Sequence, residues 1–64
     1  MNYREVAKKL KAQGCYQSRD AKGSHTYWYS PITDKQFPVP LHKGKDIKTS
    51  LVRAIQKQAG VRLL

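Results

Sequence analysis

The chain has 64 residues, and its 13 Lys and Arg against four Asp and Glu give a net charge of +9. This length allows one domain (residues 1–64) with a thin core, because a chain of about 60 residues buries only about 60% of its unfolded surface. No apolar run approaches the roughly 20 residues of a membrane-spanning helix, and charges interrupt the N-terminal stretch too often for a signal peptide. We therefore expect a soluble, cytoplasmic protein.

The charge predicts a polyanionic partner, and nucleic acid, an acidic protein and an anionic membrane are the candidates. Basic residues are spread from Arg4 to Arg62 without a polybasic tail, and no large apolar helix face is present. Both observations argue against a membrane partner. Solvated lysines account for part of the charge without any partner.

The first predicted element is a helix from about Tyr3 to Gln13. Asn2 can cap it, and Glu5 completes a capping box three residues later. Gly14 supplies a left-handed stop. The apolar stripe at helical spacing consists of Tyr3, Val6, Ala7 and Leu10. A second face at the same spacing carries Arg4, Lys8 and Lys11.

Residues 15–17 form a short candidate strand, and the polar residues 18–23 are predicted to form a loop. Cys15 is the single cysteine, which excludes an internal disulfide and a cysteine zinc cluster. We interpret Cys15 as a small, partly buried residue at a strand start, because the local sequence offers no base that would activate a thiolate.

The clearest strand in the sequence is 24–30, which is rich in aromatic and β-branched residues. Residues 31–35 have the composition of a hairpin turn, and 36–39 return as a third strand. Pro38 and Pro40 lack the backbone N–H that a central strand needs. We therefore expect the third strand to lie at an edge of the sheet or to end early.

A basic loop, 41–48, leads to a second predicted helix that Thr49 or Ser50 would cap. Its predicted apolar stripe consists of Leu51, Ala54, Ile55 and Ala59. Gly60 ends this helix, and Val61 is expected to pack back onto its last turn. The order helix, three strands, helix predicts an α+β fold in which two helices cover one face of a three-stranded antiparallel sheet.

His25 begins the aromatic strand, where a sheet can hold its backbone while the ring stays accessible to solvent. Tyr27 and Tyr29 share its face by the two-residue period, while Thr26 and Trp28 point the other way. We favour Trp28 in the core, which leaves Tyr27 or Tyr29 able to stack on a base. The opposite assignment holds if the strand twists or bulges near its start. On these residues alone, His25 is most simply a packed or hydrogen-bonded residue at a strand end.

Five features follow one another along the chain: a helix ending at Gly14, the motif Gly23-Ser24-His25 before aromatic residues, Val39-Pro40 with His42 and Gly44, Leu51 with Ile55, and Lys57-Gln58-Ala59-Gly60-Val61. With these features the chain resembles the HicA (YcfA-like) family of small mRNA-interferase toxins over nearly its whole length. It departs from many relatives at Thr49-Ser50, where they have Gly-Thr. We expect Ser50 to cap the helix as effectively as a threonine would, so this departure leaves the predicted fold unchanged.

The resemblance implies a double-stranded-RNA-binding-domain fold and a toxin of a type II toxin–antitoxin system. It implies cleavage of mRNA, which inhibits translation and growth, and neutralisation by an acidic antitoxin of the HicB type. The family's catalytic histidine falls on His25.

RNA carries its own nucleophile, the 2′-hydroxyl, so a ribonuclease must take its proton, protonate the leaving 5′-oxygen and stabilise the phosphorane. Imidazole suits the proton transfers near neutral pH, and neither a metal nor a cofactor is required. His42 is a minor second candidate, and it is equally well interpreted as a phosphate contact or a turn residue. The residues predicted to bind RNA are Lys22, Lys43, Lys45 and Tyr27. The N-terminus of the second helix, near Ser50, is a further candidate site for a backbone phosphate.

Two other functions fit the same residues. In a non-catalytic RNA-binding module of this fold, His25 is structural. In a small adaptor, the charge serves only to bind an acidic protein, and the face of Arg4, Lys8 and Lys11 is a candidate contact for such a partner. Steep loss of RNA affinity with salt separates the binding module from the adaptor.

Overall fold

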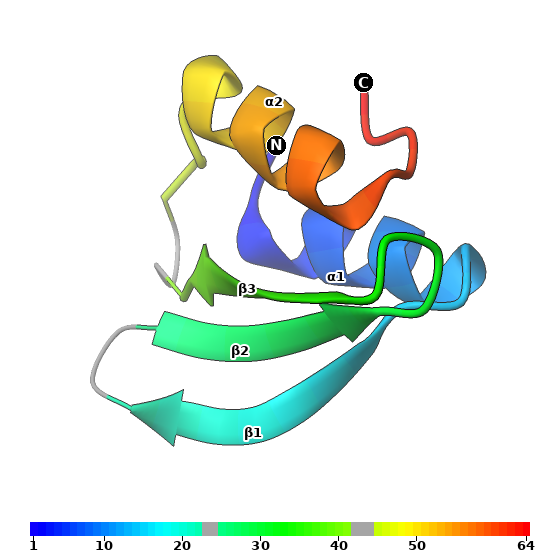
Figure 1. The fold of residues 1–64 in the computed structure, drawn as a ribbon. Helices are drawn as coiled ribbons and strands as arrows, with labels where there is room; N and C mark the ends of the chain where they lie inside the picture. Colours follow the sequence, from blue (N-terminus) through cyan, green and yellow to red (C-terminus); the bar gives the residue numbers. More distant parts are fainter. Residues whose placement is uncertain (23–24, 42–44) are drawn as a thin grey trace.

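Both helices lie on one face of a three-stranded antiparallel sheet (Figure 1). The computed structural model describes residues 1–22, 25–41 and 45–64, and for residues 19–22 it describes the backbone alone. The elements in chain order are α1 (Tyr3–Ala12), β1 (Tyr16–Lys22), β2 (His25–Ser30), β3 (Lys35–Pro40) and α2 (Thr49–Ala59). The strand order is β1-β2-β3. The predicted α+β architecture is confirmed.

The predicted capping box begins α1. The Asn2 side chain accepts a hydrogen bond from the Glu5 N–H at 2.9 Å, and the Glu5 carboxylate accepts one from the Asn2 N–H. The buried side chains of the helix are Val6 and Leu10. Gly14 adopts φ +99°, a conformation that favours glycine, so the predicted stop is confirmed.

β1 is much longer than predicted, and β3 extends the predicted 36–39 by one residue at each end. Residues 18–22 belong to β1, so the prediction of a loop at 18–23 is wrong for these positions. β1 lies at an edge of the sheet: β2 pairs with one side of its backbone, and no strand of the described ranges pairs with the other side. Two register shifts interrupt this pairing, between Gln17 and Arg19 and between Arg19 and Lys22. An irregular edge strand needs no apolar alternation, which explains why the polar sequence did not indicate it.

The pairing of β2 with β3 is regular from His25↔Pro40 to Ser30↔Lys35. Among the described residues β3 pairs only with β2, which confirms that its prolines belong to an edge strand.

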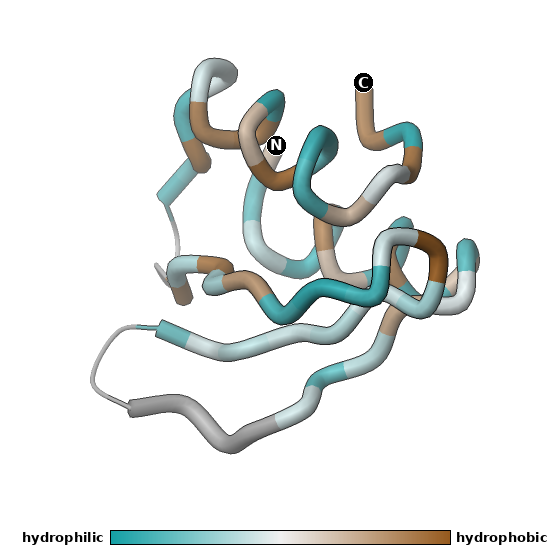
Figure 2. The backbone as a smooth tube through the Cα atoms, viewed as in Figure 1, coloured by the Kyte–Doolittle hydropathy of each residue, from teal (hydrophilic) through white to brown (hydrophobic). Residues whose placement is uncertain are grey.

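Trp28 lies in the core, as predicted, and its indole N–H donates to Thr26 Oγ1 at 3.0 Å. Thr26 Oγ1 in turn donates to the Val39 carbonyl, so the polar atoms on the buried face of β2 are paired. Figure 2 shows hydrophobic positions in the helices, the β2–β3 hairpin, the end of β3 and the C-terminal tail, whereas β2 is pale beyond its hydrophilic start. The buried hydrophobic residues are Val6, Leu10, Cys15, Trp28, Phe37, Val39, Ile47, Val52, Ile55, Ala59, Val61 and Leu63.

Two predictions about α2 are wrong. Its buried stripe is Val52, Ile55 and Ala59, while Leu51 is 39% exposed and Ala54 is also exposed. The predicted and observed stripes share Ile55 and Ala59, so the helical period alone did not distinguish them.

The start of α2 also differs from the prediction, because neither Thr49 nor Ser50 caps it. The N–H groups of Leu51 and Val52 both donate to the Lys48 carbonyl at 3.0 Å, which makes Lys48 the N-cap residue. Thr49 and Ser50 therefore lie inside the first turn, and no side chain among the described residues caps it.

The C-terminal end of α2 is attached to the β2–β3 hairpin. Gly60 adopts the predicted left-handed conformation, and its N–H donates to the Gln56 carbonyl at 2.9 Å. Ser30 Oγ donates to the Ala59 carbonyl, and Thr33 Oγ1 donates to the Gln58 carbonyl at 2.7 Å. These bonds satisfy carbonyls that a helix end otherwise leaves unpaired. Val61, also as predicted, is buried against the core.

Candidate functional site

His25 is the first residue of the central strand, and its side chain is exposed. Its register partners are Lys22 in β1 and Pro40 in β3, so strands flank its backbone on both sides. Because β2 alternates regularly, the His25 side chain lies on the face of the sheet opposite to the buried Thr26. The backbone is therefore fixed while the ring is accessible to solvent.

The start of β2, the end of β3 and the start of α2 lie at the same end of the molecule (Figure 1). Lys22 is placed at this end by its register with His25. Lys45 is exposed and lies just before α2. The structure therefore brings predicted RNA-binding positions from β1 and from the segment before α2 to the end of the sheet that carries His25.

The N-terminus of α2 contributes further positive potential at this end. The amides of Thr49 and Ser50 precede the first helical hydrogen bonds, and a helix N-terminus carries about half a positive charge. A shallow groove beside it is lined by Lys45, Asp46, Ile47, Lys48 and Leu51. A hydrogen bond from the Ile47 N–H to the Met1 carbonyl, 2.6 Å, holds this segment against the N-terminus of the chain. Such a surface is suited to a phosphate group.

Tyr27 and Tyr29 are partly exposed on the His25 face, which the helices leave open. Ser18 Oγ donates to the Tyr27 carbonyl at 3.1 Å, and the Gln36 side-chain amide donates to Ser18 Oγ at 3.0 Å. The Tyr29 hydroxyl donates to the Asp34 carboxylate. This hydrogen bond, with a smaller contribution from desolvation, raises the pKa of Tyr29 above its ordinary value.

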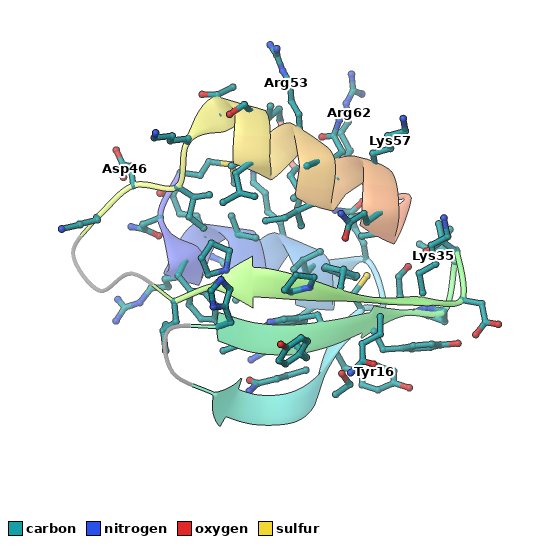
Figure 3. All side chains as sticks on the ribbon, turned by 60° about the vertical axis from the view of Figure 1, so that its left-hand side comes forward. Tyr16, Lys35, Asp46, Arg53, Lys57 and Arg62 are labelled. Carbon is teal, nitrogen blue, oxygen red and sulfur yellow. The ribbon has the colours of Figure 1, made fainter. Side chains whose placement is uncertain are left out.

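Sequence reasoning missed Tyr16, which pairs with Tyr29 across β1 and β2 and is 55% exposed. Figure 3 places Tyr16 on the side of the sheet away from the helices. The interrupted register of β1 is a tertiary property, so no local pattern identified this pairing.

Two predicted residues, His42 and Lys43, lie outside the described residues, as do Gly23 and Ser24 of the histidine motif. Their roles stay predictions. Among the side chains that the structure describes, no group of three or more His, Cys, Asp or Glu is arranged to hold a metal ion.

A second basic region lies on the helical side. Side chains of α1 line a shallow groove, and they are Tyr3, Arg4, Ala7, Lys8 and Lys11. On α2 and the tail after it, Arg53, Lys57 and Arg62 point away from the sheet (Figure 3). Positive charge therefore lies on the helical side as well as at the end of the molecule where β2 begins with His25. In the described ranges, no helix is long and apolar enough to cross a membrane.

Comparison with known families matches residues 3–61 to the model of the HicA toxin of bacterial toxin–antitoxin systems. The chain belongs to the HicA toxin family. No curated protein and no solved structure matches it. The match confirms the resemblance seen in the sequence. It identifies this HicA family member as the toxin component of a bacterial toxin–antitoxin system. The matched range includes all five helices and strands described above.

Proposed function

We propose that this HicA family member is an endoribonuclease toxin that cleaves mRNA without a metal ion and uses His25 as a general acid or base. One observation carries the proposal: an exposed histidine is fixed at the start of the central strand, at the end of the molecule where the α2 N-terminus also lies. The net charge of +9 supplies the attraction to a polyanion.

In this mechanism the 2′-hydroxyl of the substrate attacks the adjacent phosphorus, and the bond to the 5′-oxygen of the next nucleotide breaks. The imidazole of His25 takes the proton from the 2′-hydroxyl or gives one to the leaving oxygen. Proton transfer by a positioned side chain contributes roughly 10²- to 10⁴-fold to a rate. His42 is the proposed minor candidate for the other proton transfer, and water is the alternative.

The substrate contacts that we propose surround His25. Lys22 and Lys45 come from segments at the same end of the molecule, and Lys43 follows β3 and precedes α2 in the sequence. These cations and the α2 N-terminus would hold backbone phosphates and stabilise the charge of the phosphorane. Tyr27, two residues along β2 from His25, would stack on an unpaired base.

The proposed partner that silences the toxin is an acidic antitoxin of the HicB type, and we propose that both proteins act in the cytoplasm. Membership of the toxin family supports an antitoxin partner. A single acidic protein could cover His25 and neutralise the basic surface in one binding event. The groove of Arg4, Lys8 and Lys11 is a second contact surface of suitable charge.

A non-catalytic RNA-binding module is the alternative, because the charge and the open tyrosine face support RNA binding whether or not the histidine reacts. The test is to express the wild type and His25→Ala from a tightly controlled promoter and to follow growth and total mRNA. We expect growth arrest and loss of mRNA with the wild type alone.

Equal arrest by the two proteins, with the variant shown to be folded, would remove His25 from the mechanism. Arrest by the wild type with intact mRNA would favour the binding module.

A further inference from the structure

Three of the four tyrosines of the chain lie on the sheet face that the helices leave open. Tyr27 and Tyr29 share this face with His25, because β2 alternates without interruption. Tyr16 joins them because it is the direct cross-strand partner of Tyr29. The tryptophan and the phenylalanine of the chain, Trp28 and Phe37, are buried on the helical side instead. The open face is therefore an exposed aromatic surface that begins at His25.

Tyr16 and Tyr29 form a pair at the far end of this surface. Their ring centroids are 5.5 Å apart and the ring planes are inclined by 46°. The hydrogen bond from Tyr29 to Asp34 fixes the Tyr29 ring, while Tyr16 keeps more than half of its surface accessible, at 55%. Because one ring of the pair is already fixed and the other is exposed, a base can stack on the pair at little cost in conformational entropy.

We infer that the pair of Tyr16 and Tyr29 is a base-stacking site for single-stranded RNA that extends from His25 along β2. This inference rests on the proposed function. His25 and Tyr29 are four residues apart, which is about 13 Å at the usual strand rise. A stacked single strand that rises about 3.4 Å per nucleotide covers this length in about four nucleotides. The base stacked on this pair therefore lies about four nucleotides from the cleaved bond. An extended RNA chain would cover the same distance with fewer nucleotides. Tyr27 lies between His25 and the pair.

The substrate class follows from the chemistry of the surface. A stacking site needs the open face of an unpaired base, which single-stranded RNA presents and the interior of a duplex does not. The charge of +9 favours RNA over an uncharged peptide, and the continuity of the tyrosines with His25 favours the substrate over a separate protein.

The first test measures binding of a fluorescent 2′-O-methyl octanucleotide, which lacks the nucleophile and is not cleaved. We expect Tyr16→Ala to weaken binding about 5- to 140-fold, the loss of one stacked base, and Tyr16→Phe to stay within about 2-fold of the wild type. Leu64→Ala is the matched control, because Leu64 is an exposed apolar residue (49%) at the chain end beside the helices, and we expect it to leave binding unchanged. A duplex of the same sequence should be insensitive to Tyr16→Ala.

The second test places 5-iodouridine at successive positions of the same oligonucleotide, irradiates the complex and maps the adducts by mass spectrometry. We expect adducts on Tyr16 or Tyr29 only when the 5-iodouridine lies near one end of the oligonucleotide.

Full affinity of Tyr16→Ala for the octanucleotide, or adducts confined to the helical side, would overturn the inference. Lost affinity for the antitoxin with unchanged affinity for RNA would also overturn it and make the pair a protein contact. Because the oligonucleotide is not cleaved, binding that depends on Tyr16 would support the inference even if the protein proved to have no nuclease activity.

Discussion

Tyr29 and Asp34 form a hydrogen bond at the hairpin end of the open face, five residues apart in the chain. The hydroxyl donates to the carboxylate, so the neutral form of Tyr29 is the stabilised form and its pKa lies above the ordinary value. Asp34 itself has φ +53°, in the left-handed region that Asn also tolerates. Asp34→Asn therefore removes the charge without a backbone penalty.

We expect Asp34→Asn to lower the pKa of Tyr29 toward the ordinary value of about 10. Tyrosinate absorbance followed against pH checks this, and Tyr29→Phe identifies the transition that belongs to Tyr29. An unchanged titration curve in Asp34→Asn would show that the charge of the Asp34 carboxylate does not raise the pKa of Tyr29 in solution.

The same shift predicts the pH dependence of stability. The pKa of Tyr29 is raised in the folded state, so its contribution to stability is complete below about pH 10, the unfolded value, and is lost as pH rises through the folded value. The wild type should therefore lose more stability in this alkaline window than Asp34→Asn does. Thermal unfolding of both proteins at matched pH values measures the difference, and parallel curves would contradict the expectation.

At the scale of elements, the capping box, both glycine stops and the aromatic strand follow from local chemistry, and so they were predictable from the sequence. Asn2 and Glu5 satisfy orphan N–H groups whatever the rest of the chain does, and a positive φ at Gly14 or Gly60 requires no distant contact. The extent of β1 and the buried face of α2 were not predictable. They depend on which neighbour supplies hydrogen bonds or apolar contacts, and the local sequence does not contain that information.

The buried face of α2 is tested by a pair of neighbouring substitutions. Val52→Ala should lower the free energy of unfolding by about 1.5–3 kcal/mol, because the Val52 side chain is buried, at 1% exposure. Leu51→Ala should change it by less than about 1 kcal/mol, because Leu51 is 39% exposed. Urea unfolding of both variants measures which substitution lowers the free energy of unfolding more. A larger decrease in Leu51→Ala would show that the helix face predicted from the sequence is the buried one.

The junction between α2 and the hairpin is tested at Gly60. A Cβ on Gly60 would lie 2.7 Å from Thr33 Cγ2 and 3.2 Å from Ile32 Cγ2, in addition to the left-handed strain of φ +67°. Gly60→Ala should therefore cost more than the roughly 1–2 kcal/mol expected from strain alone.

Thr33→Ser removes the nearer methyl group and keeps the hydroxyl that donates to Gln58. In a double-mutant cycle, Thr33→Ser should recover part of the cost of Gly60→Ala. Strictly additive unfolding energies would show that the hairpin tip does not pack on Gly60 in solution.

At the scale of the whole molecule, the sheet separates two surfaces. The open face carries His25 and the tyrosines, and the helical side carries Arg53, Lys57 and Arg62. The sequence indicated His25 and Tyr27 correctly as neighbours on one face, because the two-residue period of a strand is a local property. It did not indicate Tyr16, whose place depends on pairing across β1 and β2.

We propose that RNA binds the open face and that the antitoxin also contacts the helical side. RNA binding on the open face should weaken steeply with salt, because each neutralised phosphate releases a counterion. An antitoxin that contacts the helical side as well as the open face would hold the toxin while it excludes the substrate.

The most direct test of the account is cleavage of an end-labelled mRNA fragment by the purified protein in excess EDTA. The account predicts cleavage by the wild type that leaves a 5′-hydroxyl on the downstream product, because the 2′-hydroxyl is the nucleophile. It predicts a rate about 10²- to 10⁴-fold lower for His25→Ala, with an unfolding transition like that of the wild type. Cleavage by folded His25→Ala at the wild-type rate, or cleavage by the wild type only after metal is added, would contradict it.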